Sequence, residues 1–301
     1  MVTRFGLLAA IAACVVLAAC RPDGRGITDT GWNDDDADSG SDGNGTHDTG
    51  VDPQCASGAE WVYLVDAGYN LIRFEPDDLR LISIGHLDCP GAGAGTPFSM
   101  SVDRNGVAWV LYNGGRIYHV STTDASCATT TFTPHQNGFE LFGMGFVSLE
   151  EGSTQETLYI AGGAALEVAT GSSTLGTIDA RLTVSPIAEL PGWPELTGTG
   201  EGQLWGFFPD STPPSVRRID TSNGASLEVH ELTALGTFTA AAWAFAAWGG
   251  RYYIFLQRQS DDSTHVWRLD PRDDTLEDVL PDIGYRIVGA GVSTCAPYNL
   301  I

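Results

Sequence analysis

The sequence predicts an all-β chain that folds as a five-bladed β-propeller with four-stranded blades. From Glu60 onward, short runs of aromatic and β-branched residues alternate with Gly, Asp, Asn and Pro turns, and no long stretch has helical period. A strand motif with small side chains recurs five times along this part of the chain. The last copy of that motif stands at the C-terminal end, where it can complete the first blade.

The recurring motif has small side chains at two alternating positions, mostly with larger apolar residues outside them. Alternate residues of a strand lie on one face, so each motif has a face that tolerates only small groups. Such a face is expected where five strands converge on a common axis. The motifs are FSMSV (98–102), FGMGF (142–146), LTGTG (196–200), WAFAAW (243–248) and VGAGV (288–292), with the small pairs Ser99/Ser101, Gly143/Gly145, Thr197/Thr199, Ala244/Ala246 and Gly289/Gly291.

The spacing of the motifs matches one four-stranded propeller blade, which takes about 40–50 residues. Three further candidate strands follow most copies, as in VAWVLY, RIYHVST and CATTTFT after the motif at 98–102. The blade that starts at 142–146 is longer than the others, so a six-bladed or irregular ring remains an alternative. Residues 61–87 form only three strands, and RIVGAGVST near the C-terminus is predicted to supply the missing innermost one, which leaves no open edge at the seam.

The N-terminal residues predict export followed by lipid anchoring. Arg4 precedes an apolar run of small residues, 6–19, that is too short to span a bilayer and has the form of a signal peptide. The run ends in LAAC, which resembles a bacterial lipobox and implies cleavage before Cys20 and acylation of Cys20. Arg21 follows, which by resemblance to Gram-negative lipoproteins favours the outer membrane, facing the periplasm or the cell surface. The expected divisions are a signal peptide at 1–19, a lipidated acidic linker at 20–54 and a propeller at 55–301.

The acidic balance of the chain limits its partners. The formal net charge is −23, which argues against nucleic acid and anionic membrane surfaces as partners and leaves the lipid at Cys20 as the membrane contact. Residues 21–54 are poor in apolar side chains and are expected to be disordered. Asp38, Asp42 and Asn44 do not meet the spacing of a calcium-binding EF-hand loop, so no metal site is predicted.

Four cysteines remain after residue 54, an even number that suggests two disulfides in an exported chain, with three connectivities open. In the propeller arrangement Cys295 ends the innermost strand of blade one and Cys55 lies just before the next strand. The prediction is therefore a Cys55–Cys295 bond that clamps the seam. Cys89 and Cys127 then pair across the outer parts of blades one and two.

No catalytic motif is evident: the sequence has no G-x-S-x-G, HExxH, CxxC or P-loop pattern, and no cofactor is predicted. Propeller glycosidases, which place two carboxylates at the channel mouth, are the enzyme alternative. The candidates are Asp103, Glu140, Glu195 and Glu201. Glu140 and Glu195 precede inner strands and belong to one end of the ring, whereas Asp103, also a good turn former, and Glu201 belong to the other.

A binding role is the better hypothesis, at the face made by the inter-blade loops and the loops between second and third strands. Trp193, held between two prolines in PGWPE, is expected to be rigid and exposed. Aromatic rings beside amide and charged groups suit a sugar or a peptide, so the ligand is an envelope protein or a glycan. The candidate ligand-binding residues are Tyr69, Asn70, Tyr112, His135, Glu140, Trp193, Glu195, Tyr285 and Arg286.

Several segments carry a family resemblance: PFSMSVDRNGVAWVLY, FGMGF, ELTGTG, WAFAAWGG and RIVGAGVSTCAP. Together they resemble a set of uncharacterised lipoproteins from myxobacteria with a propeller-like repeat domain. The resemblance implies a lipoprotein and no particular activity. The sequence thus favours a lipid-anchored cell-envelope interaction module, with a carbohydrate-binding or glycoside-cleaving propeller as the alternative.

Overall fold

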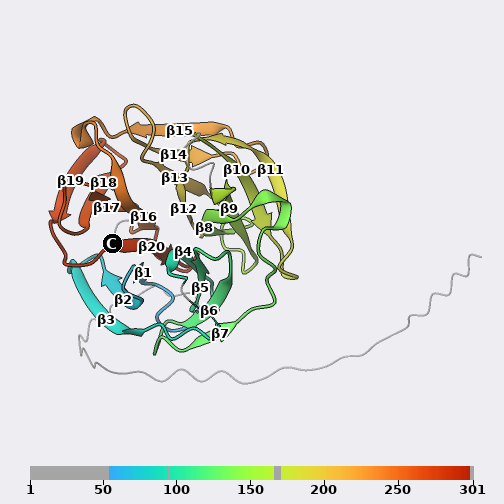
Figure 1. The fold of residues 1–301 in the computed structure, drawn as a ribbon. Helices are drawn as coiled ribbons and strands as arrows, with labels where there is room; N and C mark the ends of the chain where they lie inside the picture. The colour runs from blue at the N-terminus through green and yellow to red at the C-terminus, as the bar shows by residue number, and fades with distance from the viewer. Residues whose placement is uncertain (1–53, 92, 94, 166–170, 299–301) are drawn as a thin grey trace, which may run out of the picture. The chain divides into compact units, whose positions relative to one another are not determined.

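The computed structural model describes residues 54–298 apart from 92, 94 and 166–170. In this part of the chain, five four-stranded antiparallel sheets are arranged around a centre as the blades of a propeller (Figure 1). The five-bladed prediction is confirmed. The predicted signal peptide at 1–19, the lipidation site Cys20 and nearly all of the linker at 20–54 lie outside the described residues. Within the described ranges, no helix has the length and apolar character needed to cross a membrane.

Each blade runs from an innermost strand outward. Blade one contains β20 (Ile287–Val292), β1 (Val62–Asp66), β2 (Asn70–Glu75) and β3 (Arg80–His86), and blade two contains β4 (Pro97–Val102), β5 (Val107–Tyr112), β6 (Ile117–Ser121) and β7 (Cys127–Thr129). Blade three contains β8 (Leu141–Ser148), β9 (Glu156–Gly163), β10 (Ser172–Ile178) and β11 (Val184–Pro191). Blade four contains β12 (Glu195–Gly198), β13 (Leu204–Phe208), β14 (Ser215–Ile219) and β15 (Ser226–Glu231), and blade five contains β16 (Ala240–Trp248), β17 (Arg251–Arg258), β18 (His265–Asp270) and β19 (Thr275–Leu280).

The five inner strands carry the predicted motifs, except that Thr199 and Gly200 lie beyond the end of β12, and the motif glycines of β8 and β20 face a neighbouring inner strand. A Cβ atom placed on Gly143 of β8 would lie 2.6 Å from the Pro194 carbonyl oxygen, at the entry to β12. One placed on Gly291 of β20 would lie 2.9 Å from the Cα atom of Ser101 in β4. The Phe146 amide donates to Ser101 Oγ at 3.1 Å, which ties β8 to β4. The inner strands therefore approach one another too closely for larger groups, as the motif predicted.

The ring is closed by the pairing of β1 with β20, in which Leu64 lies opposite Ala290. A disulfide joins Cys55 to Cys295, with Cα atoms 6.0 Å apart, beside this seam. A second disulfide joins Cys89 to Cys127, with Cα atoms 5.0 Å apart, between blades one and two. Both predicted pairings are confirmed, and the strand pairing places Cys55 and Cys295 together although 240 residues separate them in sequence.

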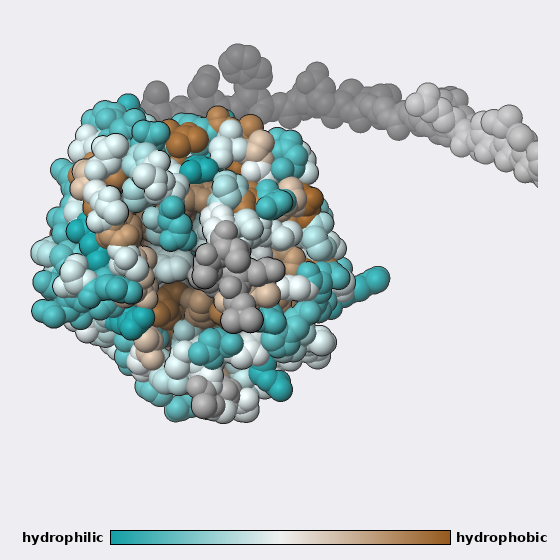
Figure 2. All heavy atoms as spheres, turned by 45° about the horizontal axis from the view of Figure 1, so that its top comes forward, coloured by the Kyte–Doolittle hydropathy of each residue, from teal (hydrophilic) through white to brown (hydrophobic). Residues whose placement is uncertain are grey.

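The core lies between blades, where aromatic and aliphatic side chains of adjacent sheets interdigitate. Phe74 of blade one meets Tyr253 and Phe255 of blade five with ring centroids 5.4 and 5.6 Å apart, both edge-on. Such edge-to-face pairs add to the stabilisation from burial. Figure 2 shows apolar side chains in a hollow near the middle of the face that it presents, surrounded by mostly hydrophilic residues.

Two predicted strands are shorter in the structure than in the sequence pattern. β12 ends at Gly198, because Thr199 starts a turn in which its hydroxyl oxygen accepts a hydrogen bond from the Gln203 amide and its carbonyl oxygen accepts one from the Gly202 amide. β7 consists of only Cys127–Thr129, because the Thr130 hydroxyl turns back to donate to the Ile117 carbonyl. These turns leave longer loops at the two ends of the ring.

Candidate binding site

The ring has two ends with different loops. The inter-blade end is formed by the loops that connect blades and by those between second and third strands. The opposite end is formed by the loops between first and second strands, by those between third and fourth strands and by the segment after β20. All nine predicted ligand-binding residues belong to the inter-blade end.

Tyr69, Asn70 and Tyr112 come together at the inter-blade end of blades one and two. The rings of Tyr69 and Tyr112 lie 6.4 Å apart, and the Tyr69 hydroxyl donates to the Gly95 carbonyl at 3.3 Å. Asn70 donates from Nδ2 to Asp66 at 2.8 Å, so its side chain is engaged within its own loop. Tyr112 is buried, and this burial raises the pKa of its hydroxyl. The group mainly packs the loops together, with Tyr69 and Asn70 as its partly accessible members.

Four other predicted residues at this end form two separate local groups. His135 Nδ1 lies 3.6 Å from Glu140 Oε1, while Glu140 Oε2 accepts a hydrogen bond from the Ala165 amide at 2.9 Å. Arg286 is exposed and donates from Nη2 to the Ala241 carbonyl at 2.7 Å, and the adjacent Tyr285 is partly buried against the core between blades one and five. Their polar groups are thus largely used for holding loops.

The prediction that Trp193 is exposed is wrong. Trp193 is 3% exposed, and its indole N–H has no hydrogen-bond partner among the described residues. The cause is the early start of β12 at Glu195, which carries the preceding residues into the ring. The carbonyl of Pro194 already lies against Gly143 of the neighbouring inner strand. A ligand could therefore reach the Trp193 ring only if this segment moved.

Glu195 is also inside the ring. It is 4% exposed, and its Oε2 accepts a hydrogen bond from Ser99 Oγ at 3.0 Å. Ser99 belongs to blade two and Glu195 to blade four, so this bond joins the inner strands of two blades that are not adjacent in the ring. Burial raises the pKa of Glu195 well above its ordinary value, and the Ser99 hydrogen bond only partly opposes this rise. The carboxyl group is thus a buried link between inner strands.

Replacing Glu195 with Gln is expected to increase the free energy of unfolding near pH 7 by on the order of 1 kcal/mol. The buried carboxyl group must either bind a proton or carry its charge into the core, whereas the amide is neutral at every pH. Because the pKa of Glu195 is raised in the folded state, its contribution to the free energy of unfolding is fully present below the unfolded-state pKa, ordinarily 4.5. That contribution is lost as pH rises through the folded-state pKa. The gain from Glu195→Gln should therefore grow with pH. Urea unfolding at several pH values measures this, with Glu231→Gln on exposed β15 as control; a gain independent of pH would contradict it.

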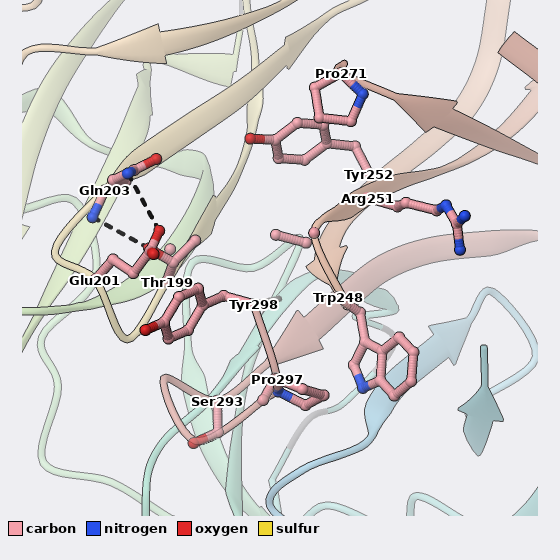
Figure 3. A pocket seen from close by; sticks show the side chains of 14 residues that line it. Thr199, Glu201, Gln203, Trp248, Arg251, Tyr252, Pro271, Ser293, Pro297 and Tyr298 are labelled. Carbon is pink, nitrogen blue, oxygen red and sulfur yellow. Dashed lines mark hydrogen bonds between the residues drawn. The ribbon is translucent and has the colours of Figure 1, made fainter. Parts of the chain in front are cut away.

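A pocket with a volume of about 190 Å³ lies at the opposite end of the ring (Figure 3). It lies between the β12–β13 loop, the β16–β17 loop and the segment after β20, and Pro271 after β18 borders it. None of the nine predicted ligand-binding residues lines it. The side chains with aromatic or polar groups that line this pocket, named here the seam pocket, are Thr199, Glu201, Gln203, Trp248, Arg251, Tyr252, Ser293 and Tyr298.

Two of the aromatic walls of the seam pocket are held in place by the core. The Trp248 indole N–H donates to the Glu60 carbonyl at 2.8 Å, and its ring stacks with Trp61 at 6.5 Å between centroids. Tyr252 packs against Trp205 with ring centroids 4.7 Å apart, and burial raises the pKa of its hydroxyl. These contacts give the pocket rigid walls, which lowers the entropic cost of binding.

The charged groups of the seam pocket are unevenly distributed. Glu201 accepts a hydrogen bond from Gln203 Nε2 at 3.2 Å, and its pKa is raised by partial burial and by the negative charge of Glu151. Glu151 Oε1 in turn accepts a hydrogen bond from the Tyr298 hydroxyl at 3.2 Å. Arg251 Nε lies 3.6 Å from Asp270 Oδ2, and Figure 3 shows its side chain extending away from Glu201.

The four carboxylates considered for glycoside cleavage are distributed over separate places. Asp103 holds a turn, because its Oδ1 accepts from the amides of Asn105 and Val107 at 2.9 and 3.0 Å. Glu195 is buried in the ring, Glu140 supports a loop at the inter-blade end, and Glu201 lines the seam pocket. Among the described residues, no group of three His, Cys, Asp or Glu is arranged to hold a metal ion.

The strand pattern of the sequence predicts the end of the ring at which Glu201 lies, but it does not predict the aromatic residues around Glu201. Trp248 and Tyr252 flank the turn in WGGRYY directly after an inner strand, and Tyr298 follows the last one in CAPY. Aromatic residues at or just after the ends of two inner-strand motifs were therefore the signal from which this pocket could have been predicted. That these turns belong to adjacent blades one and five follows only from ring closure.

No family model and no curated protein matches this chain. Solved structures match it over most of its length at low identity. A chain of a nidogen–laminin complex is 13% identical, with a TM-score of 0.48, over 77% of this chain and 97% of that one. TolB from Acinetobacter baumannii is 14% identical, with a TM-score of 0.43, over 77% of this chain and 55% of that one. A chain of a mitotic checkpoint complex is 11% identical, with a TM-score of 0.36, over 83% of this chain and 75% of that one. Matches this distant carry no argument about ligands or partners.

Proposed function

We propose that this chain is a lipid-anchored interaction module of the cell envelope, which binds a protein partner at the seam pocket. The observation that carries the proposal is the combination of three aromatic side chains with polar groups in one open hollow, at the meeting of blades one, four and five. Aromatic residues around a small pocket are typical anchor sites of protein interfaces. A rigid propeller supplies the fixed loops on which such a site depends.

Pocket size favours a protein side chain over a glycan. The volume of about 190 Å³ is below the range of about 300–1,000 Å³ that holds drug-sized ligands. A single side chain of a partner can enter such a space while the surrounding loops contact the rest of the partner. The glycan alternative depended on an exposed Trp193, and that side chain is buried.

The tether supports the same arrangement. Cys55 is bonded to Cys295, and Ser293 and Ala296 on either side of Cys295 line the seam pocket. The chain thus enters the propeller at the pocket end. A disordered linker over 20–54 would have a root-mean-square span of about 30 Å, so a lipid at Cys20 would keep this end near a membrane-bound partner.

Site-specific photo-cross-linking in the full chain tests the proposal. A cross-linking amino acid at Tyr298 is expected to trap a discrete partner in the membrane fraction of the producing cells. The same group at Tyr285, at the inter-blade end, should trap it far less. Cys20→Ser should release the chain from that fraction and reduce the yield of the cross-linked product. Equal cross-linking from both positions, or none from either, would count against the seam pocket as the binding site.

A further inference from the structure

Glu201 and Glu151 lie close enough for the charge of one to raise the pKa of the other. Among the described residues, neither forms an ion pair. Their side chains accept hydrogen bonds from neutral groups, Gln203 Nε2 on Glu201 and the Tyr298 hydroxyl on Glu151. Two carboxylates without a paired cation in the described part of the chain leave a negative site beside the seam pocket, which Glu201 lines.

Tyr252 is a second, independent polar feature of the seam pocket. Its side chain is 7% exposed, it lines the seam pocket, and its hydroxyl has no hydrogen bond to any described residue. Figure 3 shows the hydroxyl directed toward the side of the pocket where Glu201 and Gln203 lie. The hydroxyl oxygen is not among the fully buried atoms that lack a partner, so it faces the open pocket and is available to hydrogen-bond a group that enters there.

The aromatic walls restrict the kind of group that fits. The rings of Tyr252, Tyr298 and Trp248 border the pocket, and ring faces attract cations when the cation is desolvated. The one pocket-lining guanidinium, Arg251, points away from Glu201 and is paired with Asp270, so it does not occupy the negative side. Carboxylates, a hydroxyl acceptor and aromatic faces together match an ammonium or guanidinium group on an apolar stem.

We propose that the seam pocket binds a lysine or arginine side chain presented by a basic segment of a partner protein. The inference rests on the proposed interaction function and specifies the chemistry of its anchor. The stem of the side chain contacts the aromatic walls, and its charged end lies at Glu201 near the Tyr252 hydroxyl. The net charge of −23 on the whole chain favours approach of a basic partner from a distance.

Capped pentapeptides with one central charged residue among glycines test this inference directly. Calorimetric titration of the full chain compares an arginine peptide with its citrulline analogue, and a lysine peptide with its acetyl-lysine analogue. Citrulline keeps the shape of arginine, and acetyl-lysine extends the lysine side chain by an acetyl group; both analogues remove the charge. We expect the charged peptides to bind and each neutral analogue to bind at least about tenfold more weakly.

Two protein variants locate the effect. Glu201→Gln should weaken binding of the arginine peptide by about tenfold or more, whereas Glu231→Gln, which removes the same charge from exposed β15, should change it by less than about twofold. No binding of either charged peptide, equal binding of the neutral analogues, or an unchanged affinity in Glu201→Gln would overturn the proposal.

Failure of this proposal is distinguishable from failure of the interaction function. If cross-linking from position 298 traps a partner while the charged peptides do not bind, the pocket is an interaction site with a different anchor. If both experiments fail, the interaction function at this pocket fails with the inference.

Discussion

Replacing Cys55 and Cys295 together with serine is expected to lower the free energy of unfolding by about 5 kcal/mol, the largest effect of any change considered. The bond closes a loop of 240 residues in the unfolded chain, and loop-closure entropy predicts about 5 kcal/mol for a loop of this length. Urea unfolding of the double variant, followed by intrinsic fluorescence from the tryptophans, measures the difference.

The second disulfide is the matched control. Cys89 and Cys127 enclose a loop of 38 residues, for which the same argument predicts about 4 kcal/mol. The two bonds differ more clearly in where they act. Only loss of Cys55–Cys295 should speed amide hydrogen exchange in β20, because the C-terminal strand then depends on its hydrogen bonds to β1 alone. Protection of β20 equal to the wild type would show that the bond does not clamp the seam.

Gly143→Ala is expected to lower the free energy of unfolding by about 3 kcal/mol or more, at the upper end of the usual cost of overpacking. The added Cβ atom would lie 2.6 Å from the Pro194 carbonyl oxygen and 2.9 Å from the Glu195 Cα atom. Both are backbone atoms of the neighbouring inner strand and its entry, so no side chain can turn aside to relieve the contact. The ring would have to expand around its axis, which disturbs all five blades.

Thermal unfolding measures this effect as a fall in melting temperature of about 6–12 °C, from about 2–4 °C per kcal/mol in a domain of this size. Gly114→Ala is the control, because an added Cβ atom there meets nothing within 4 Å. It should leave the melting temperature within about 2 °C of the wild type, as exposed substitutions usually do. A Gly143→Ala protein as stable as the control would mean that the inner strands are not closely packed.

The features that the sequence analysis predicted correctly are those with a repeated or short-range signal. Small residues at alternating positions, as in Gly143 and Gly145, identify an inner strand because crowding acts on every copy of the repeat. Residues 61–87 supply only three strands of a four-stranded blade, so the C-terminal segment was expected to supply the fourth. Cys55 and Cys295 then had to be neighbours, which made their bond predictable from strand order alone.

The features that sequence analysis missed depend on where particular loops of different blades meet. Trp193 is in a proline-rich turn, which usually lies at a surface, but the early start of β12 carries it inside. The Ser99–Glu195 bond joins residues 96 positions apart on non-adjacent blades, and no local pattern marks such a pair. Both depend on the narrow radius of the five-strand centre.

The seam pocket shows most clearly the difference between what the sequence predicts and what only the tertiary structure determines. Residue order alone predicted a closed five-bladed ring, its seam and both of its disulfides, while the length of blade three left a six-bladed ring open. Only the tertiary structure decided which end carries the pocket, because Glu201, Tyr252 and Tyr298 come from three different blades, Tyr252 from the start of strand β17. Each residue is unremarkable within its own loop. Their meeting is set by the angle and depth at which neighbouring blades pack, and many long-range contacts determine these quantities together.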